Sequence, residues 1–165
     1  MSKPVNDPPR RRFLRGLLAL APAGLLGATT ARAADSADDL RFPGDPAEHR
    51  VVYQLNHADI DYMEHVIFSV GAMLRKYTDN IEIVVVAFGP GIHILGKRPE
   101  RTVPKLLQQR VESLSQYGVK FIACGNTMKS LGWEAEDILP FAEIEEVGAA
   151  ALMEYQEKGY SYISW

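Results

Sequence analysis

The hydrophobic pattern of the chain predicts five short β-strands between residues 50 and 165. The run Ile81–Phe88 (IEIVVVAF) is apolar nearly throughout, which is typical of a strand buried on both faces of a parallel sheet. The other runs are short and apolar or β-branched, and turn residues bound them. The expected strands are Arg50–Leu55, Ile81–Phe88, Val119–Ala123, Phe141–Val147 and Tyr160–Trp165.

Segments with helical periodicity separate these strands. Between Ile60 and Tyr77 the apolar positions recur three and four residues apart, as they do along one face of a helix. Two further helices are expected at Arg101–Tyr117 and Ala149–Glu157, where a glycine soon after each segment acts as a stop signal. A short helix is expected at Asn126–Leu131, and Gly89–Gly91 is expected to form a flexible loop.

The alternation of strands and helices predicts the fold class. It indicates an α/β protein in three layers, with a mainly parallel sheet of about five strands and helices on both faces. In such sheets ligands and chemistry gather at the carboxyl ends of the strands. These ends correspond here to the loops at residues 56–59, 89–96 and 124–128.

The first 33 residues have the order of an export signal. Basic residues come first, followed by the uncharged run Gly16–Ala28 and by small residues that end at Ala33. The uncharged run is too short to cross a bilayer as a helix, which takes about 20 residues. The segment RRRFLRG from Arg10 resembles a twin-arginine signal. We therefore expect a removable twin-arginine signal peptide at residues 1–33, an extended leader at residues 34–48, a folded domain at residues 49–165 and a periplasmic location.

Charge and cysteine content exclude several classes of function. The whole chain has a formal net charge of −3, but six of its 18 lysines and arginines lie in the first 33 residues. The remainder carries 12 basic and 20 acidic side chains, a charge of −8, which argues against nucleic acid or an anionic membrane as a partner after signal cleavage. A single cysteine excludes an intramolecular disulfide and the paired cysteines of zinc-finger and iron–sulfur sites. No metal and no cofactor are expected.

Cys124 is the candidate catalytic residue. It follows the predicted strand Val119–Ala123 directly and precedes a short helix. A thiol at a helix N-terminus feels the positive end of the helix dipole and unpaired N–H groups, and both favour the thiolate. The supporting residues are Asn126 or Thr127 as helix cap, and Lys129. The alternative is a small buried hydrophobe at a strand end, because free cysteine is among the most buried residue types.

Two histidines and two glycines belong to the same expected edge of the sheet. Gly89 and Gly91 give the backbone flexibility to approach a ligand. His93 and His57 are candidate bases, proton donors or ligands, although a lone histidine is more often a structural residue. The glycines do not form a phosphate-binding loop, because neither GxxxxGK[ST] nor GxGxxG follows a strand.

Taken together, these segments resemble the DsrE/DsrF-like family of sulfur-relay proteins, in particular its exported single-domain members. The matching segments are Val51–Tyr53, Ile81–Gly91, Tyr117–Met128 and Gln156–Ile163. The most specific of them is the cysteine that follows a strand and precedes Asn-Thr-Met. The resemblance covers the chain from Arg50 to Trp165.

The resemblance implies an α/β sandwich that assembles as homotrimers or hexamers. It also implies that Cys124 accepts sulfur and passes it on as a persulfide, in a sulfur-carrier or sulfurtransferase-like role with a donor or acceptor protein as partner. The sulfur-relay members are cytoplasmic and work with partner subunits, whereas this chain carries an export signal.

Two other hypotheses stay open at this point. One is a non-catalytic homo-oligomeric module that binds a small ligand among the loops Asn56–Asp59 and Gly89–Leu95, with Cys124 as a structural residue. The other is a redox role in which Cys124 forms a disulfide between subunits, as an unpaired cysteine in an exported chain allows.

Overall fold

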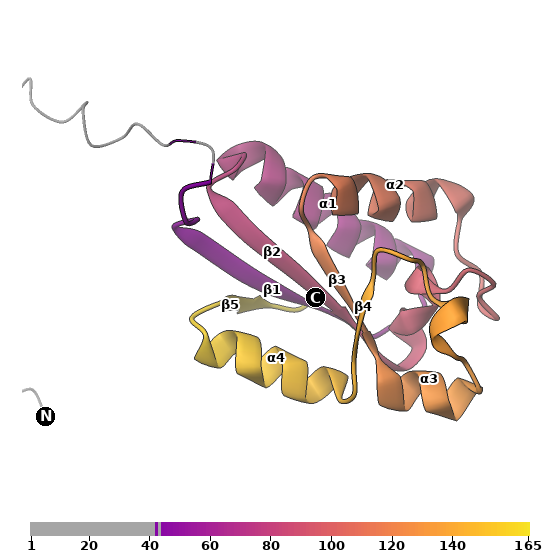
Figure 1. Ribbon diagram of the computed structural model, residues 1–165. Helices are drawn as coiled ribbons and strands as arrows, with labels where there is room; N and C mark the ends of the chain where they lie inside the picture. Colours follow the sequence, from indigo (N-terminus) through magenta and orange to yellow (C-terminus); the bar gives the residue numbers. More distant parts are fainter. Residues whose placement is uncertain (1–41, 43) are drawn as a thin grey trace, which may run out of the picture. The chain divides into compact units, whose positions relative to one another are not determined.

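The computed structural model describes residue 42 and residues 44–165. These residues form a five-stranded parallel sheet with helices on both faces (Figure 1), which confirms the predicted three-layer α/β fold. The elements in chain order are β1 (His49–Leu55), α1 (Ile60–Tyr77), β2 (Ile81–Ala87), the 3-10 helix η1 (Gly89–Leu95), α2 (Lys105–Gln116), β3 (Lys120–Cys124), α3 (Gly125–Leu131), the 3-10 helix η2 (Ala135–Asp137), β4 (Glu143–Glu145), α4 (Gly148–Glu157) and β5 (Ser161–Ile163).

The strand order explains why helices cover both faces. The order is β4-β3-β2-β1-β5, so the first four strands step in one direction and β5 returns to pair with β1. A connection between parallel strands is right-handed in nearly all proteins, so reversing the direction moves the connecting helix to the opposite face. Accordingly, α1 and α2 lie on one face of the sheet and α4 lies on the other (Figure 1).

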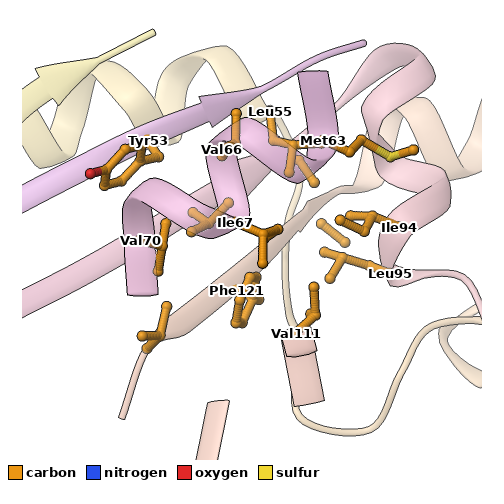
Figure 2. Close-up of a cluster of buried hydrophobic side chains, with 14 of the residues drawn as sticks. Tyr53, Leu55, Met63, Val66, Ile67, Val70, Ile94, Leu95, Val111 and Phe121 are labelled. Carbon is orange, nitrogen blue, oxygen red and sulfur yellow. The ribbon is translucent and has the colours of Figure 1, made fainter. Parts of the chain in front are cut away.

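The larger core lies between the sheet and the layer formed by α1 and α2. Val66, Ile67 and Val70 lie three and four residues apart on α1, and their side chains are buried in one cluster with Leu55 of β1 and Phe121 of β3 (Figure 2). This face of α1 is the one that the sequence periodicity indicates. Asp59 caps the helix by accepting a hydrogen bond from the Tyr62 backbone N–H at 2.9 Å.

A smaller core lies on the face covered by α4 alone. Its buried members are Val52, Val84, Val86, Ile122, Ala151 and Leu152. Polar groups line its margin near the amino ends of the strands, where Arg50 pairs with Glu82 at 3.8 Å and Lys120 with Glu143 at 3.3 Å. The Tyr160 hydroxyl donates a hydrogen bond to Glu82. One helix therefore covers the middle of this face, and ion pairs occupy its edge.

Three predicted boundaries are wrong. The second long helix begins at Lys105 rather than Arg101, because Pro104 is its N-cap and the residue before a proline is disfavoured in helical conformation. The last two strands are only three residues long, at Glu143–Glu145 and Ser161–Ile163. Both are edge strands, and short edge strands limit unwanted pairing with other chains.

The expected flexible loop at Gly89–Gly91 is also wrong. These residues start η1, whose residues Gly91–Leu95 are all buried. The apolar residues Ile92, Ile94 and Leu95 belong to the larger core. The sequence pattern concealed this helix because seven residues show neither a strand nor a full helical period.

The predicted signal peptide and residues 34–41 and 43 of the predicted leader lie outside the described residues. In the part of the chain that the structure describes, no helix has both the length and the apolar character needed to cross a membrane. The first strand begins at His49.

Removing the ring of Phe121 is expected to destabilise the domain. Phe121 is fully buried in the larger core, and replacing such a phenylalanine by alanine costs about 3–5 kcal/mol in transfer and cavity energy. The matched control is Phe42→Ala, since Phe42 is 67% exposed and its loss is expected to cost at most about 0.5 kcal/mol. Urea denaturation of both variants measures the difference, and equal free energies of unfolding would contradict this description of the core.

Candidate functional site

Cys124 lies where the starts of two helices meet. It is the last residue of β3 and the residue from which α3 begins. The backbone N–H of Gly148, the first residue of α4, donates a hydrogen bond to its sulfur at 3.2 Å. The sequence predicts the first of these helix starts at the cysteine. The second comes from a segment 24 residues further along the chain.

The surroundings of the sulfur favour its ionised form. Burial raises the pKa of the Cys124 thiol, but hydrogen bonds from the Thr127 side chain and from the backbone of Gly148, Thr127 and Asn126 lower it. The donors outweigh burial, so the pKa lies below the ordinary value of a cysteine thiol. Donors aimed at a thiolate stabilise its charge without a partner cation. The site therefore provides a nucleophile through backbone geometry.

Thr127 connects the thiol to the end of β2. Its hydroxyl oxygen accepts a hydrogen bond from the backbone N–H of Gly89 at 3.0 Å. The hydroxyl proton then remains for the sulfur, because an oxygen that accepts from one group donates to another. Gly89 has φ +50°, a conformation that glycine adopts at no steric cost. This glycine thus orients the hydroxyl that faces the thiol.

The segment Glu145–Gly148 packs closely over the sulfur. A Cβ atom added to Gly148 would lie 3.0 Å from the Cys124 Cβ and 3.1 Å from the Phe88 Cβ. The backbone carbonyl of Glu146 accepts a hydrogen bond from the Asn126 N–H at 2.9 Å and lies 3.9 Å from the sulfur. As a result only 6% of Cys124 is exposed, which limits direct access to small reagents.

The predicted supporting residues of α3 have separate positions. The N-cap is Cys124 itself, which makes no side-chain cap hydrogen bond, so the expectation that Asn126 or Thr127 caps this helix is wrong. Both residues lie in its first turn instead. Lys129 pairs with the carboxylate of Glu146 at 3.7 Å. Its charge therefore neutralises the covering segment, and among the described residues no contact joins it to the sulfur.

His57 and His93 lie away from the sulfur. His57 is exposed beyond the end of β1, with its ring edge-on to Tyr62 at 5.0 Å, and β2 separates β1 from β3. His93 is 2% exposed, with its ring edge-on to Trp133 at 5.1 Å. Its Nδ1 has no hydrogen-bond partner, and burial lowers its pKa. The structure does not bring either histidine to Cys124.

Gly91 has a packing role. A Cβ atom at this position would overlap the backbone carbonyl of Leu55, so only glycine lets η1 approach the end of β1. Among the described residues, no group of three His, Cys, Asp or Glu side chains has the arrangement of a metal site.

Sequence reasoning missed Glu146 and Gly148, which complete the site. They belong to the segment between β4 and α4, and the register places Glu145 beside Cys124. The small residues Gly148, Ala149 and Ala150 at the start of a helix were the available signal, because a helix start approaches another backbone closely only where side chains are small.

The family follows from this fold and from the sequence match. The model of the DsrE/DsrF-like family matches residues 27–165. The chain belongs to this family. The match includes both Cys124 and the segment that covers it. A comparison with curated proteins gives no match.

Solved structures with the same fold extend this assignment. A protein of unknown function, MTH1491 from Methanobacterium thermoautotrophicum, is 25% identical with a TM-score of 0.64, over 72% of this chain and 100% of that chain. The ychN protein from E. coli is 11% identical with a TM-score of 0.56, over 71% and 99%. BT1422 from Bacteroides thetaiotaomicron, also of unknown function, is 15% identical with a TM-score of 0.52, over 70% and 94%. The last two show similarity of fold alone.

Buried His93 is expected to make this DsrE/DsrF-like domain less stable at acidic pH. Its pKa is lowered in the folded state, so the unfolded chain binds the proton first. The stability that neutral His93 provides is present above about pH 6.5, the ordinary histidine pKa, and is lost as the pH falls below it. Urea denaturation between pH 5 and 8 is expected to show a weaker pH dependence for His93→Gln. The matched control is exposed His57→Gln, which is expected to keep the parental slope. Identical slopes for parent and His93→Gln would contradict the prediction.

Proposed function

We propose that this protein carries sulfane sulfur as a persulfide on Cys124. The observation that supports the proposal most directly is the convergence of N–H and O–H donors on the sulfur. A thiolate is the nucleophile in sulfur exchange, and its fraction at neutral pH rises as the pKa falls. Membership of the DsrE/DsrF-like family agrees with this chemistry.

The transfer needs two nucleophilic displacements and no external oxidant. The Cys124 thiolate attacks the terminal sulfur of a polysulfide donor, a new S–S bond forms on Cys124, and the electron pair of the broken S–S bond leaves with the shortened donor. A thiolate of the acceptor then attacks the outer sulfur. The bond to the Cys124 sulfur breaks and its electron pair restores the thiolate. The donors from α3 and α4 stabilise Cys124 as leaving group in this second step.

The proposal includes export and self-assembly. Residues 1–33 act as a twin-arginine signal, and the domain works in the periplasm after folding in the cytoplasm. The family resemblance favours homotrimers or hexamers, and the limited access to Cys124 in a single chain favours a small sulfur donor.

A second function is favoured by that same low exposure of Cys124. A packed thiol also suits a non-catalytic homo-oligomeric module that binds a small ligand or senses redox state, in which the cysteine serves packing. In that case the hydrogen bond from Gly148 fixes the start of α4 rather than preparing a nucleophile. The reactivity of the thiol distinguishes the two functions.

The alkylation rate of Cys124 by iodoacetamide is expected to rise with a midpoint below about pH 8.5, the ordinary pKa of the free thiol. Thr127→Val removes the hydroxyl donor while keeping the shape, and it is expected to move the midpoint upward because one donor to the thiolate is lost. After polysulfide treatment, intact mass spectrometry is expected to show one added sulfur on the parent and none on Cys124→Ser. A midpoint at or above the free-thiol value, together with no added sulfur, would leave the structural role of the cysteine.

Export is expected to depend on the paired arginines. Replacing Arg10 and Arg11 by lysine keeps the positive charge and removes the guanidinium pair of the twin-arginine signal. Cell fractionation is expected to find the parent in the periplasm and this variant in the cytoplasm. The matched control is Lys3→Arg, which lies in the same basic segment and is expected to leave export unchanged. Equal periplasmic amounts of parent and variant would refute the twin-arginine route.

A further inference from the structure

A groove with a volume of about 310 Å³ lies between α1 and α2. Buried Ile67 and half-buried Leu114 form its apolar floor, and Phe68, which is 67% exposed, forms one wall. Arg75, Arg110 and Ser113 complete the lining. The groove opens on the α1–α2 layer, whereas Cys124 shares its strand face with the core beneath α4.

A glycine in the middle of α1 makes room for this groove. Gly71 lies inside an 18-residue helix, where glycine costs about 1 kcal/mol relative to alanine. A Cβ atom there would lie 3.3 Å from Nη1 of Arg75 and 4.0 Å from Cδ2 of Leu114. The missing side chain therefore lets the Arg75 guanidinium fold back over the helix toward the apolar floor.

The two arginines give the groove a positive charge that its own lining does not neutralise. No carboxylate is among the lining residues, and within the described part of the chain neither Arg75 nor Arg110 forms an ion pair. The Arg75 guanidinium lies 5.9 Å from the centre of the Phe68 ring, a position that holds the charge beside an apolar surface. This stands out in a domain whose formal charge is negative.

We propose that this groove binds a small molecule with an anionic head group and a short apolar chain, of which a medium-chain carboxylate is the simplest example. The guanidinium groups match a carboxylate in charge and hydrogen-bond geometry, and Phe68, Ile67 and Leu114 match the chain. The volume lies at the lower end of the range of small-molecule sites. A protein partner would need a contact of roughly 800 Å² on each side. The proposal does not depend on the chemistry of Cys124.

The test is a titration of the full chain with octanoate, followed by two-dimensional ¹⁵N–¹H NMR. Saturable shifts are expected at Phe68, Gly71 and Ser113. Sulfate, which has the charge but no chain, and octanol, which has the chain but no charge, are each expected to bind more weakly by about tenfold or more, because charge-assisted hydrogen bonds and apolar burial both contribute. Absence of saturable shifts at these residues, or equal binding of octanol and octanoate, would overturn the proposal.

Variants separate this site from general surface binding. Arg75→Gln combined with Arg110→Gln is expected to weaken octanoate binding by about tenfold or more. The control Lys105→Gln removes one positive charge from α2 outside the lining and is expected to leave binding unchanged. Loss of affinity in the control as well would overturn the proposal. So would shifts at the groove residues that depend on protein concentration in the absence of octanoate, since a second copy would then be the occupant.

Discussion

The crossover from β4 to β5 is the constraint on which the rest of the structure depends. It returns the chain from one edge of the sheet to the other, and the right-handed rule sends it across the face opposite to α1 and α2. One segment therefore does two things. Ala151 and Leu152 of α4 bury the second face of the sheet, and Gly148 at its start donates to the sulfur of Cys124. The second layer and the candidate site share one origin.

The thiol site shows opposing effects of burial and hydrogen bonding. Low exposure raises the pKa of Cys124, and the converging donors lower it by more. The same close packing that brings the Gly148 N–H to the sulfur leaves no room for a side chain at that position. A nucleophile made in this way needs no metal and no cationic side chain in contact with the sulfur. It is protected from bulky reagents by the backbone that activates it.

The two faces of the sheet differ in how they are covered. The face under α1 and α2 holds the larger core, which includes η1 and buried His93. The helices of this layer also carry a groove that is apolar at its floor and positively charged at its rim. The face under α4 has one helix, a small core and ion pairs near the amino ends of the strands. Sulfur chemistry and anion binding are thus proposed on different sides of one sheet.

The sequence by itself determined the fold class, the four long and strongly patterned elements and the location of Cys124 at a strand end before a helix. Those features depend on local periodicity, as in Ile60–Tyr77 and Ile81–Ala87, or on adjacency along the chain. The short elements escaped it, because η1 and the edge strands β4 and β5 are defined by neighbours rather than by period. Only the tertiary structure decided that Gly148 and Glu146 meet the thiol, that His57 and His93 do not, and that Gly71 opens a groove beneath Arg75. These contacts join residues distant in sequence or depend on the space left by a missing side chain, and a linear pattern carries neither kind of information.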